Sequence, residues 1–123
     1  MSGARQSFPD PISSHVLDTS AGVPGRDIPI SLWKLNQQDG KWLVVGNRQS
    51  TNNDGRASAF LTWDDFTIGV YKAHFEVAPY FQGKNQESFF PFCEIVFEVK
   101  NADQHYHIPL LLSPFSYTTY RGS

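Results

Sequence analysis

Cysteine, charge and long apolar runs are all scarce in this sequence. The single cysteine, Cys93, excludes a disulfide within the chain and suits a reducing compartment. The formal net charge is only −2, and charged residues make up 18% of the 123 residues, so no strong field favours nucleic acid or an anionic membrane as partner. No stretch approaches the roughly 18 apolar residues of a membrane span. We therefore expect one domain that binds neither.

Several signatures of chemistry are also missing. The sequence has no glycine-rich phosphate loop, no serine nucleophile elbow and no Cys/His spacing of a structural zinc site. Cofactor-dependent and covalent chemistries therefore lose support, and we expect no cofactor. Residues 1–12 have no apolar segment of the kind found in a secretory signal. They are predicted to form a flexible N-terminal tail ahead of a domain over residues 13–123.

Aromatic and β-branched residues are what the sequence has instead. Aromatic residues reach 15%, with ten Phe and five Tyr, and they lie among Val, Ile and Thr, which favours strands over helices. Clusters of Gly, Pro, Asn and Asp break the chain into short segments, which is typical of a β-sandwich. One short helical turn is expected after Pro79. The main strands are predicted over residues 13–19, 28–35, 41–48, 70–77, 92–99, 105–112 and 115–121.

Alternation along two of these segments separates core from surface. Between Val70 and Val77 the apolar residues share one face, so His74, on the other face, is expected to be a solvated surface histidine. Cys93 falls on the apolar face of its strand and is expected in the core. In the 105–112 strand, Tyr106, Ile108, Leu110 and Leu112 share the face that should be buried.

His105 and His107 share the opposite face of that strand, directed at solvent, another subunit or a ligand. The pattern alone leaves these three open. A His-x-His pair also suits zinc, but no clear third ligand accompanies it, and no metal site is predicted. Because imidazole has a proton affinity near neutral pH, the pair could instead serve in general acid–base catalysis.

Three further places carry polar groups of interest. His15 lies in the first predicted strand, where it could equally be a structural histidine. Arg56 follows the Asp54-Gly55 turn, and its planar donors suit carbonyl or enolate oxygens, although a solvated arginine fits the pattern too. Tyr120-Arg-Gly-Ser123 ends the chain with a phenol, a guanidinium, a hydroxyl and a carboxylate. The usual fate of such an end is fraying, but it continues from an aromatic and β-branched segment that should be held in the sheet.

Several motifs occur in a characteristic order. They are His15-Val-Leu-Asp-Thr19, Thr51-Asn-Asn-Asp-Gly-Arg56, Gly69-Val-Tyr-Lys72, Phe89-Phe-Pro91, His105-Tyr-His-Ile-Pro-Leu-Leu-Leu-Ser-Pro114 and Tyr120-Arg-Gly-Ser123. Together they resemble the 5-hydroxyisourate hydrolase family over about residues 14–123. The terminal Tyr-Arg-Gly-Ser distinguishes that family from true transthyretins, which share the fold and the Leu-Leu-Ser-Pro segment.

The resemblance implies a transthyretin-like, all-β sandwich of two four-stranded sheets with one short helix. It also implies a homotetramer with active sites at the subunit interface. By their place in the motifs, His15, Arg56, His107 and Ser123 would be catalytic, and His15, Arg56 and Tyr120 would bind substrate. His105 would not itself be catalytic but would orient its neighbour or face the rim.

The implied activity is the cofactor-free hydrolysis of 5-hydroxyisourate to 2-oxo-4-hydroxy-4-carboxy-5-ureidoimidazoline, a cyclic-amide opening in urate degradation. The resemblance does not fix which of His15 and His107 acts as base. Two other functions compete with it: a transthyretin-type hormone carrier and a generic β-sandwich interaction module. The cytoplasm is the expected compartment, with the peroxisome as the alternative, because the chain has no Ser-Lys-Leu-type terminus and only an incomplete N-terminal address at Arg5-Gln6.

Overall fold

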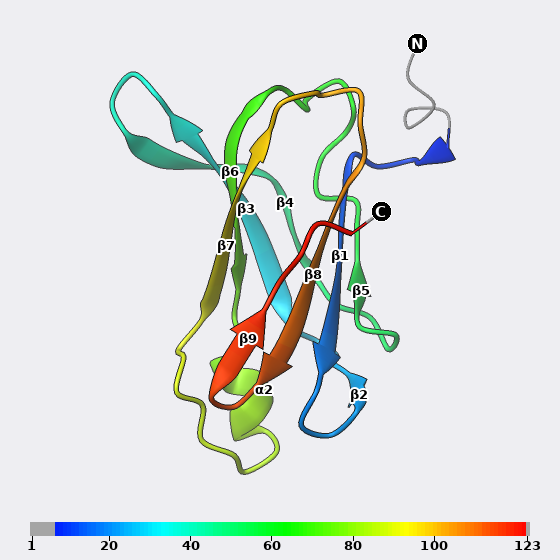
Figure 1. Cartoon of the computed structure of the whole chain (residues 1–123), viewed down its shortest axis with the longest axis vertical. Helices are drawn as coiled ribbons and strands as arrows, with labels where there is room; N and C mark the ends of the chain where they lie inside the picture. The colour runs from blue at the N-terminus through cyan, green and yellow to red at the C-terminus, as the bar shows by residue number, and fades with distance from the viewer. Residues whose placement is uncertain (1–6, 123) are drawn as a thin grey trace.

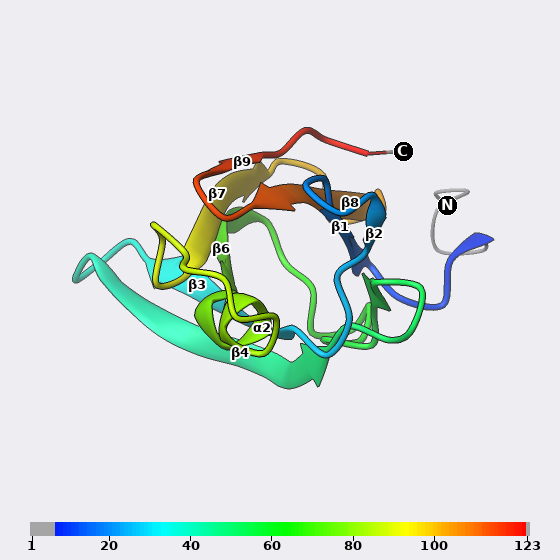
Figure 2. The ribbon, with the colours of Figure 1, turned by 90° about the horizontal axis from the view of Figure 1, so that it is seen from below.

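The computed structural model describes residues 7–122, which form two facing β-sheets and a short helix, α2 (Ala78–Gln82). The first sheet has the order β2-β1-β8-β9, with β5 paired to β1, and the second has the order β4-β3-β6-β7. Figures 1 and 2 show the two sheets enclosing the core, with α2 at one end. The strands of the first sheet are β1 (Ile12–Asp18), β2 (Val23–Pro24), β5 (Arg56–Ala57), β8 (Tyr106–Ser113) and β9 (Ser116–Thr118). Those of the second are β3 (Pro29–Asn36), β4 (Lys41–Ser50), β6 (Gly69–Phe75) and β7 (Cys93–Val99).

This architecture confirms the predicted all-β sandwich and differs from it in one sheet. The second sheet has the expected four strands, whereas the first has five, because the two-residue strand β5 pairs with β1 at His15 and Arg56. Within the described residues, no helix is long and apolar enough to cross a membrane.

The core is built from the alternating faces of both sheets. Tyr106, Ile108, Leu110 and Leu112 of β8 are buried, as the alternation predicted. Tyr71, Ala73 and Phe75 of β6 face them from the other sheet. Each large apolar side chain buried in this way contributes about 1.5–3 kcal/mol to stability. Cys93 is also in the core, where burial raises the pKa of its thiol to about 12.

The parallel pairing of β1 with β8 brings distant parts of the sequence together. These strands lie near opposite ends of the chain, and their register sets Ser13 beside His107 and His15 beside Pro109. In β1 the residues Ile12, Ser14, Val16 and Asp18 point inward and are buried. Because side chains alternate along a strand, Ser13 and His15 project from the outer face of the sheet.

The segment ahead of β1 differs from the predicted flexible tail. β1 begins at Ile12, and Pro11 is buried, its carbonyl accepting a hydrogen bond from the Tyr106 amide at 2.8 Å. The indole nitrogen of Trp63 donates to the carbonyl of Phe8 at 2.9 Å. Residues 8–12 therefore pack against the domain, while residues 1–6 lie outside the described part of the chain.

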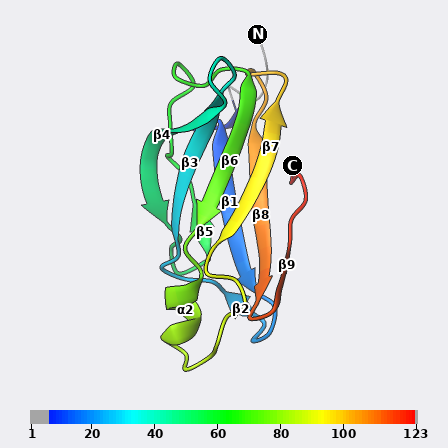
Figure 3. The same cartoon turned by 90° about the vertical axis from the view of Figure 1, so that its left-hand side faces the viewer.

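A buried carboxylate joins β1 to the segment of α2. The helix α2 lies at one end of the sandwich, as Figure 3 shows. Asp18, the last residue of β1, accepts hydrogen bonds from Tyr80 of α2 at 2.7 Å and from Lys84 at 2.6 Å. Burial alone would raise the pKa of Asp18, but the hydrogen bonds from Lys84, Ser20 and Tyr80 outweigh it and hold the pKa well below its ordinary value. The group is therefore ionised in the fold.

His74 is less exposed than predicted. It lies on the outer face of the second sheet, as the alternation indicated, but its Nδ1 is 2.8 Å from a carboxylate oxygen of Glu94. Its ring also packs on Phe92, with the ring centroids 4.7 Å apart. Pairing across β6 and β7 places His74 opposite Glu94 and explains the contact.

Candidate active site

A cavity of about 550 Å³ opens on the outer face of the first sheet, near the start of β1 and β8. Its walls include Arg56 and His107, which the family resemblance implies are catalytic. Ser13 and His105 line the same cavity. The fold thus brings together groups that are up to 94 residues apart in the sequence.

His107 is half-buried at the base of this cavity and takes part in a chain of hydrogen bonds. Its Nδ1 lies 2.8 Å from Ser13 Oγ, which in turn lies 2.9 Å from His105 Nε2. The other ring nitrogen of His105 is 2.8 Å from the carbonyl oxygen of Asp10.

Burial lowers the pKa of His107, and the nearby charges of Arg56, His105 and His15 lower it further. All three of these charges are positive when present, so each disfavours the imidazolium form. His107 is consequently uncharged at neutral pH and has a ring nitrogen that can accept a proton.

Arg56 is presented to the cavity by a tight loop. Asn52 Oδ1 accepts hydrogen bonds from the amides of Asp54 and Arg56 at 2.9 and 3.0 Å. Gly55 has φ 76°, and a Cβ there would lie 2.4 Å from the carbonyl oxygen of Val16, so this position requires glycine. Among the described residues, the Arg56 guanidinium has no hydrogen bond or ion pair of its own. Its donors are therefore available to a ligand.

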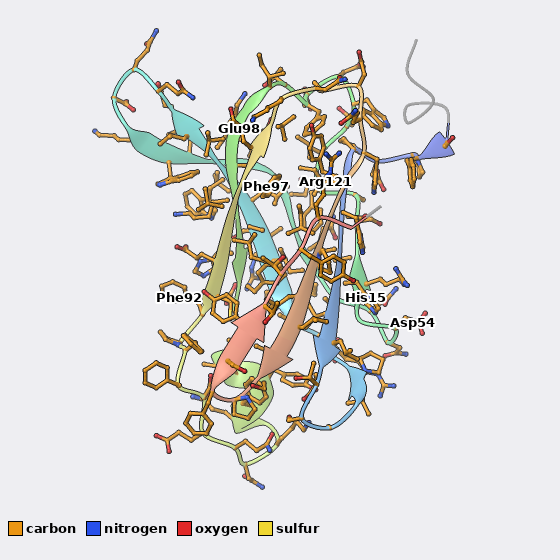
Figure 4. All side chains as sticks on the ribbon, viewed as in Figure 1. His15, Asp54, Phe92, Phe97, Glu98 and Arg121 are labelled. Carbon is orange, nitrogen blue, oxygen red and sulfur yellow. The ribbon has the colours of Figure 1, made fainter. Side chains whose placement is uncertain are left out.

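His15 lies beside this loop on the outer face of β1. It is paired with Arg56 in the β1–β5 register, so the two side chains leave the same face of the sheet. Its Nε2 is 3.1 Å from the carbonyl oxygen of Asp54, and Figure 4 shows the two residues next to each other. Because a carbonyl can only accept, His15 donates from Nε2. His15 borders the cavity without being part of its wall, but its charge reaches His107.

The C-terminal segment crosses His107. The amide of Gly122 donates to the His107 carbonyl at 2.9 Å, and the two residues form an isolated antiparallel bridge. A Cβ on Gly122 would lie only 2.4 Å from His107 Cδ2, so the segment passes directly over the ring. Ser123, predicted to be catalytic, lies outside the described residues.

Tyr120 is not brought to this cavity within one chain. It is 57% exposed and lines a different depression, together with Val96 and Phe97 of β7. The guanidinium of Arg121 lies over the ring of Tyr106, 4.4 Å from its centroid, and so also turns away from His107. Residues 120–122 are therefore split between two surfaces.

Comparison with known proteins places this geometry in a family. A model of the HIUase/Transthyretin family matches residues 12–122. The chain belongs to this family. Mouse 5-hydroxyisourate hydrolase is 42% identical over 113 residues, covering 92% of this chain and 95% of the mouse protein.

Solved structures of the HIUase/Transthyretin family share the fold described above. Sea bream transthyretin in complex with thyroxine superimposes with a TM-score of 0.85 at 29% identity, covering 91% of this chain and 94% of that one. Klebsiella pneumoniae 5-hydroxyisourate hydrolase superimposes with a TM-score of 0.74 at 31% identity, covering 91% and 92%. Because the family fold includes both kinds of protein, the site residues have to separate their functions.

Two contributors to this family member's site were missed from the sequence. Phe8 stacks on His105, with ring centroids 4.0 Å apart and planes 10° apart, although it was predicted to lie in a flexible tail. Ser13 links His107 of β8 to His105, which directly precedes that strand. The strand period does put Ser13 on the same face as His15, but no local pattern reveals that β1 pairs with β8.

Within residues 7–122, no group of three or more His, Cys, Asp or Glu side chains could hold a metal ion. His105 Nε2 and His107 Nδ1, the two nitrogens that face each other, are both engaged by Ser13. The arrangement combines an uncharged imidazole with a guanidinium that has no partner within residues 7–122, in one cavity. It can accept a proton and stabilise a developing negative charge.

Proposed function

We propose that this chain hydrolyses 5-hydroxyisourate to 2-oxo-4-hydroxy-4-carboxy-5-ureidoimidazoline, a step of urate degradation. One observation carries the proposal: Arg56, whose guanidinium has no hydrogen bond or ion pair among the described residues, shares one cavity with His107, whose pKa is lowered. The chain is 42% identical to a mouse enzyme of that name. A plant relative, 38% identical over 125 residues, is named a uric acid degradation bifunctional protein.

The reaction opens the six-membered ring at an amide bond. Water adds to a ring carbonyl, forming a C–O bond, and the bond from that carbon to the ring nitrogen then breaks. The water loses a proton to a base, and the departing nitrogen gains one. Because water is a poor nucleophile at neutral pH, a positioned base and acid accelerate such a step roughly 10²–10⁴-fold. We assign the base role to His107, because its pKa is lowered and it lies in the cavity wall.

Arg56 and His15 serve the other needs of the reaction. The guanidinium of Arg56 holds a ring oxygen and stabilises the negative charge of the tetrahedral intermediate, an effect worth about 3–4 kcal/mol for a well-placed donor. His15, beside Arg56 on the same face, binds the substrate or returns the proton to the leaving nitrogen. The backbone of Gly122 is hydrogen-bonded to that of His107. Because Ser123 is the next residue in the sequence, we keep it as a candidate catalytic residue.

A homotetramer with active sites at the subunit interface is part of the same proposal. β7 and β9 each end a sheet among the described strands, so each has a free edge for pairing. Phe115 is 67% exposed and Val96 59%, large apolar surfaces for a single chain. A neighbouring subunit would cover these surfaces, and Tyr120 would bind substrate at the interface formed there. We place the enzyme in the cytoplasm, with the peroxisome as the alternative, because its one cysteine needs no oxidising compartment.

A ligand carrier is the competing function, because the superposition on sea bream transthyretin is close. A carrier needs only to bind and release its ligand unchanged. The polar wall formed by Arg56, His105 and His107 favours the hydrolase, because hydrolysis needs a proton acceptor beside a charge-stabilising donor, whereas carriage needs no proton acceptor.

The decisive experiment is turnover by the purified full-length chain. 5-Hydroxyisourate is made freshly from urate with urate oxidase, and its decay is followed by ultraviolet absorbance. The wild-type chain should accelerate the decay over buffer, and His107→Ala should lose roughly 10²–10⁴-fold of that rate.

His74→Ala is the matched control, because His74 lies on the outer face of the other sheet in contact with Glu94 and away from the cavity. It should keep the wild-type rate. A wild-type rate no faster than buffer, or a folded His107→Ala variant at full rate, would refute the proposal.

A further inference from the structure

A chain of hydrogen bonds leads from the backbone to His107, and its donors and acceptors can be assigned from one end. The carbonyl oxygen of Asp10 can only accept, so the hydrogen in its 2.8 Å contact with His105 sits on Nδ1. In the neutral form of His105, only this one nitrogen carries a hydrogen. His105 Nε2 is therefore an acceptor.

The Ser13 hydroxyl then determines which nitrogen of His107 carries the hydrogen. This hydroxyl has a single hydrogen, which must be donated to His105 Nε2 across the 2.9 Å contact. The 2.8 Å contact between Ser13 Oγ and His107 Nδ1 can then be a hydrogen bond only if His107 is the donor. The hydrogen of neutral His107 is consequently on Nδ1, and Nε2 keeps its lone pair.

We propose that His105 and Ser13 are positioning residues that hold His107 in the tautomer with Nε2 free to act as the base. The inference rests on the proposed hydrolase function and deepens it by naming the proton-accepting atom and the residues that select it. A histidine tautomer is set by the hydrogen bond that its other nitrogen makes. Here the direction of the hydrogen bonds is fixed by the backbone carbonyl of Asp10 at the start of the chain of bonds, because a carbonyl oxygen can only accept.

The surroundings hold the first members of the chain in place. The ring of Phe8 lies nearly parallel on His105 at 4.0 Å. The carbonyl of Phe8 is held by Trp63, and the side chain of Asp10 accepts a hydrogen bond from the amide of Ala59 at 3.2 Å. The parallel register of β1 and β8 sets Ser13 directly beside His107. Each link of the chain is therefore supported by a separate contact.

The arrangement also suits the reaction step itself. When His107 Nε2 takes a proton from water, Nδ1 still carries its hydrogen and still donates to Ser13. No hydrogen bond has to reverse during proton transfer, so the site needs no reorganisation at that moment. Free histidine in water favours the opposite tautomer, with hydrogen on Nε2, which could not accept the proton at that atom.

Two variants break the chain while preserving most of the packing. His105→Phe keeps an aromatic ring against Phe8 but removes the acceptor, so the Ser13 hydroxyl can donate to His107 Nδ1 and move the imidazole hydrogen to Nε2. Ser13→Ala removes the link altogether. Ser13→Thr keeps the hydroxyl and should restore the wild-type state. Ser31→Ala is the control, because this serine lies on the other sheet, where its hydroxyl accepts a 3.3 Å hydrogen bond from Trp33.

Tautomers are measured on chains carrying ¹⁵N-histidine, by long-range ¹H–¹⁵N spectra at pH 8 without substrate. Wild type, Ser13→Thr and Ser31→Ala should show His107 with hydrogen on Nδ1, and His105→Phe and Ser13→Ala should show it on Nε2. In turnover assays, kcat of His105→Phe and of Ser13→Ala should fall roughly 10- to 100-fold, and KM should change by no more than about twofold. This loss of kcat is smaller than the loss expected when the base itself is removed.

The inference is overturned if wild-type His107 carries its hydrogen on Nε2. It is also overturned if folded His105→Phe and Ser13→Ala leave both the tautomer and kcat at wild-type values. Because the spectra are recorded without substrate, failure of the proposed function would be seen separately, as a wild-type chain with the expected tautomer and no turnover of 5-hydroxyisourate.

Discussion

Arg56 acts on His107 through charge as well as lying beside it in the cavity. After burial, its positive charge is the largest cause of the lowered pKa of His107. The other groups that lower this pKa are His105, just before β8, and His15 on β1. The ordinary pKa of histidine is about 6.5, so His107 stays neutral to a pH below that value. The acidic limb of activity should lie correspondingly low.

Replacing Arg56 with Gln should therefore change the pH profile and not only the rate. Losing the guanidinium should lower kcat/KM by roughly 10²–10³-fold, in line with about 3–4 kcal/mol of lost stabilisation. The pKa of His107 should rise towards its ordinary value, so the acidic limb of kcat/KM should move to higher pH. The profile between pH 5 and 8, together with an NMR titration of His107, measures both effects.

Arg48→Gln is a suitable control for this experiment, because Arg48 pairs with Glu76 on the surface at 2.6 Å. Its profile should match wild type. An acidic limb in Arg56→Gln that stays in place or moves to lower pH would show that the charge of Arg56 does not act on His107.

At the scale of elements, the segment after β9 reaches His107 only because residue 122 is glycine. The added methyl of Gly122→Ala would lie 2.4 Å from His107 Cδ2 and 3.1 Å from its Cβ, so either the ring or the segment must shift. A displacement of about 1 Å in a catalytic group can cost roughly 10²-fold in rate. We expect a loss of kcat on that order with little change in Tm, measured by turnover and thermal unfolding.

Gly83→Ala is the matched control, because a Cβ there would meet its nearest neighbours at 3.5 Å, an ordinary contact. It should retain wild-type kcat. If Gly122→Ala were equally active, the C-terminal segment would have no part in placing the His107 ring.

Some strands could be predicted from sequence patterns and others could not. Strict alternation predicted the buried faces of β6 and β8, because burial of one face leaves a period of two in the sequence. The two-residue strand β5 has too few positions to leave such a period. The pairing of β1 with β8 leaves no local trace either, since the strands are separated by most of the chain. Alternation placed His107 on the outer face of its strand, and the family resemblance implied its catalytic role. The link from His107 to Ser13 could not be predicted.

At the scale of the whole molecule, one end of the sandwich holds a buried structural contact, and the cavity lies nearer the other end. At one end, the buried charge of Asp18 joins β1 to α2 through Tyr80 and Lys84. Nearer the other end, β1 and β8 present Ser13 and His107 to the open cavity. The superposition on transthyretin shows that the same frame serves a protein solved with thyroxine, so the frame alone does not specify hydrolysis. We propose that a few side chains on one face of the first sheet specify it.

The proposed tetramer can be tested at an exposed aromatic residue. Phe115 lies in the turn between β8 and β9 and is 67% exposed, so Phe115→Asp should cost a single chain little folding stability. If this ring anchors a subunit contact, its loss should weaken assembly by about 2 kcal/mol or more, which is roughly 30-fold or more in Kd. Size-exclusion chromatography with light scattering should show smaller species at low micromolar concentration.

Turnover should fall together with assembly, since the proposed active site is completed at the subunit interface. Ile68→Asp is the control: Ile68 is 63% exposed but lies next to β6 in the second sheet, away from the β8–β9 turn. That variant should keep both the size and the rate of wild type. If Phe115→Asp dissociated into smaller species that kept full activity, each chain would hold a complete site, and the interface would serve stability instead of catalysis.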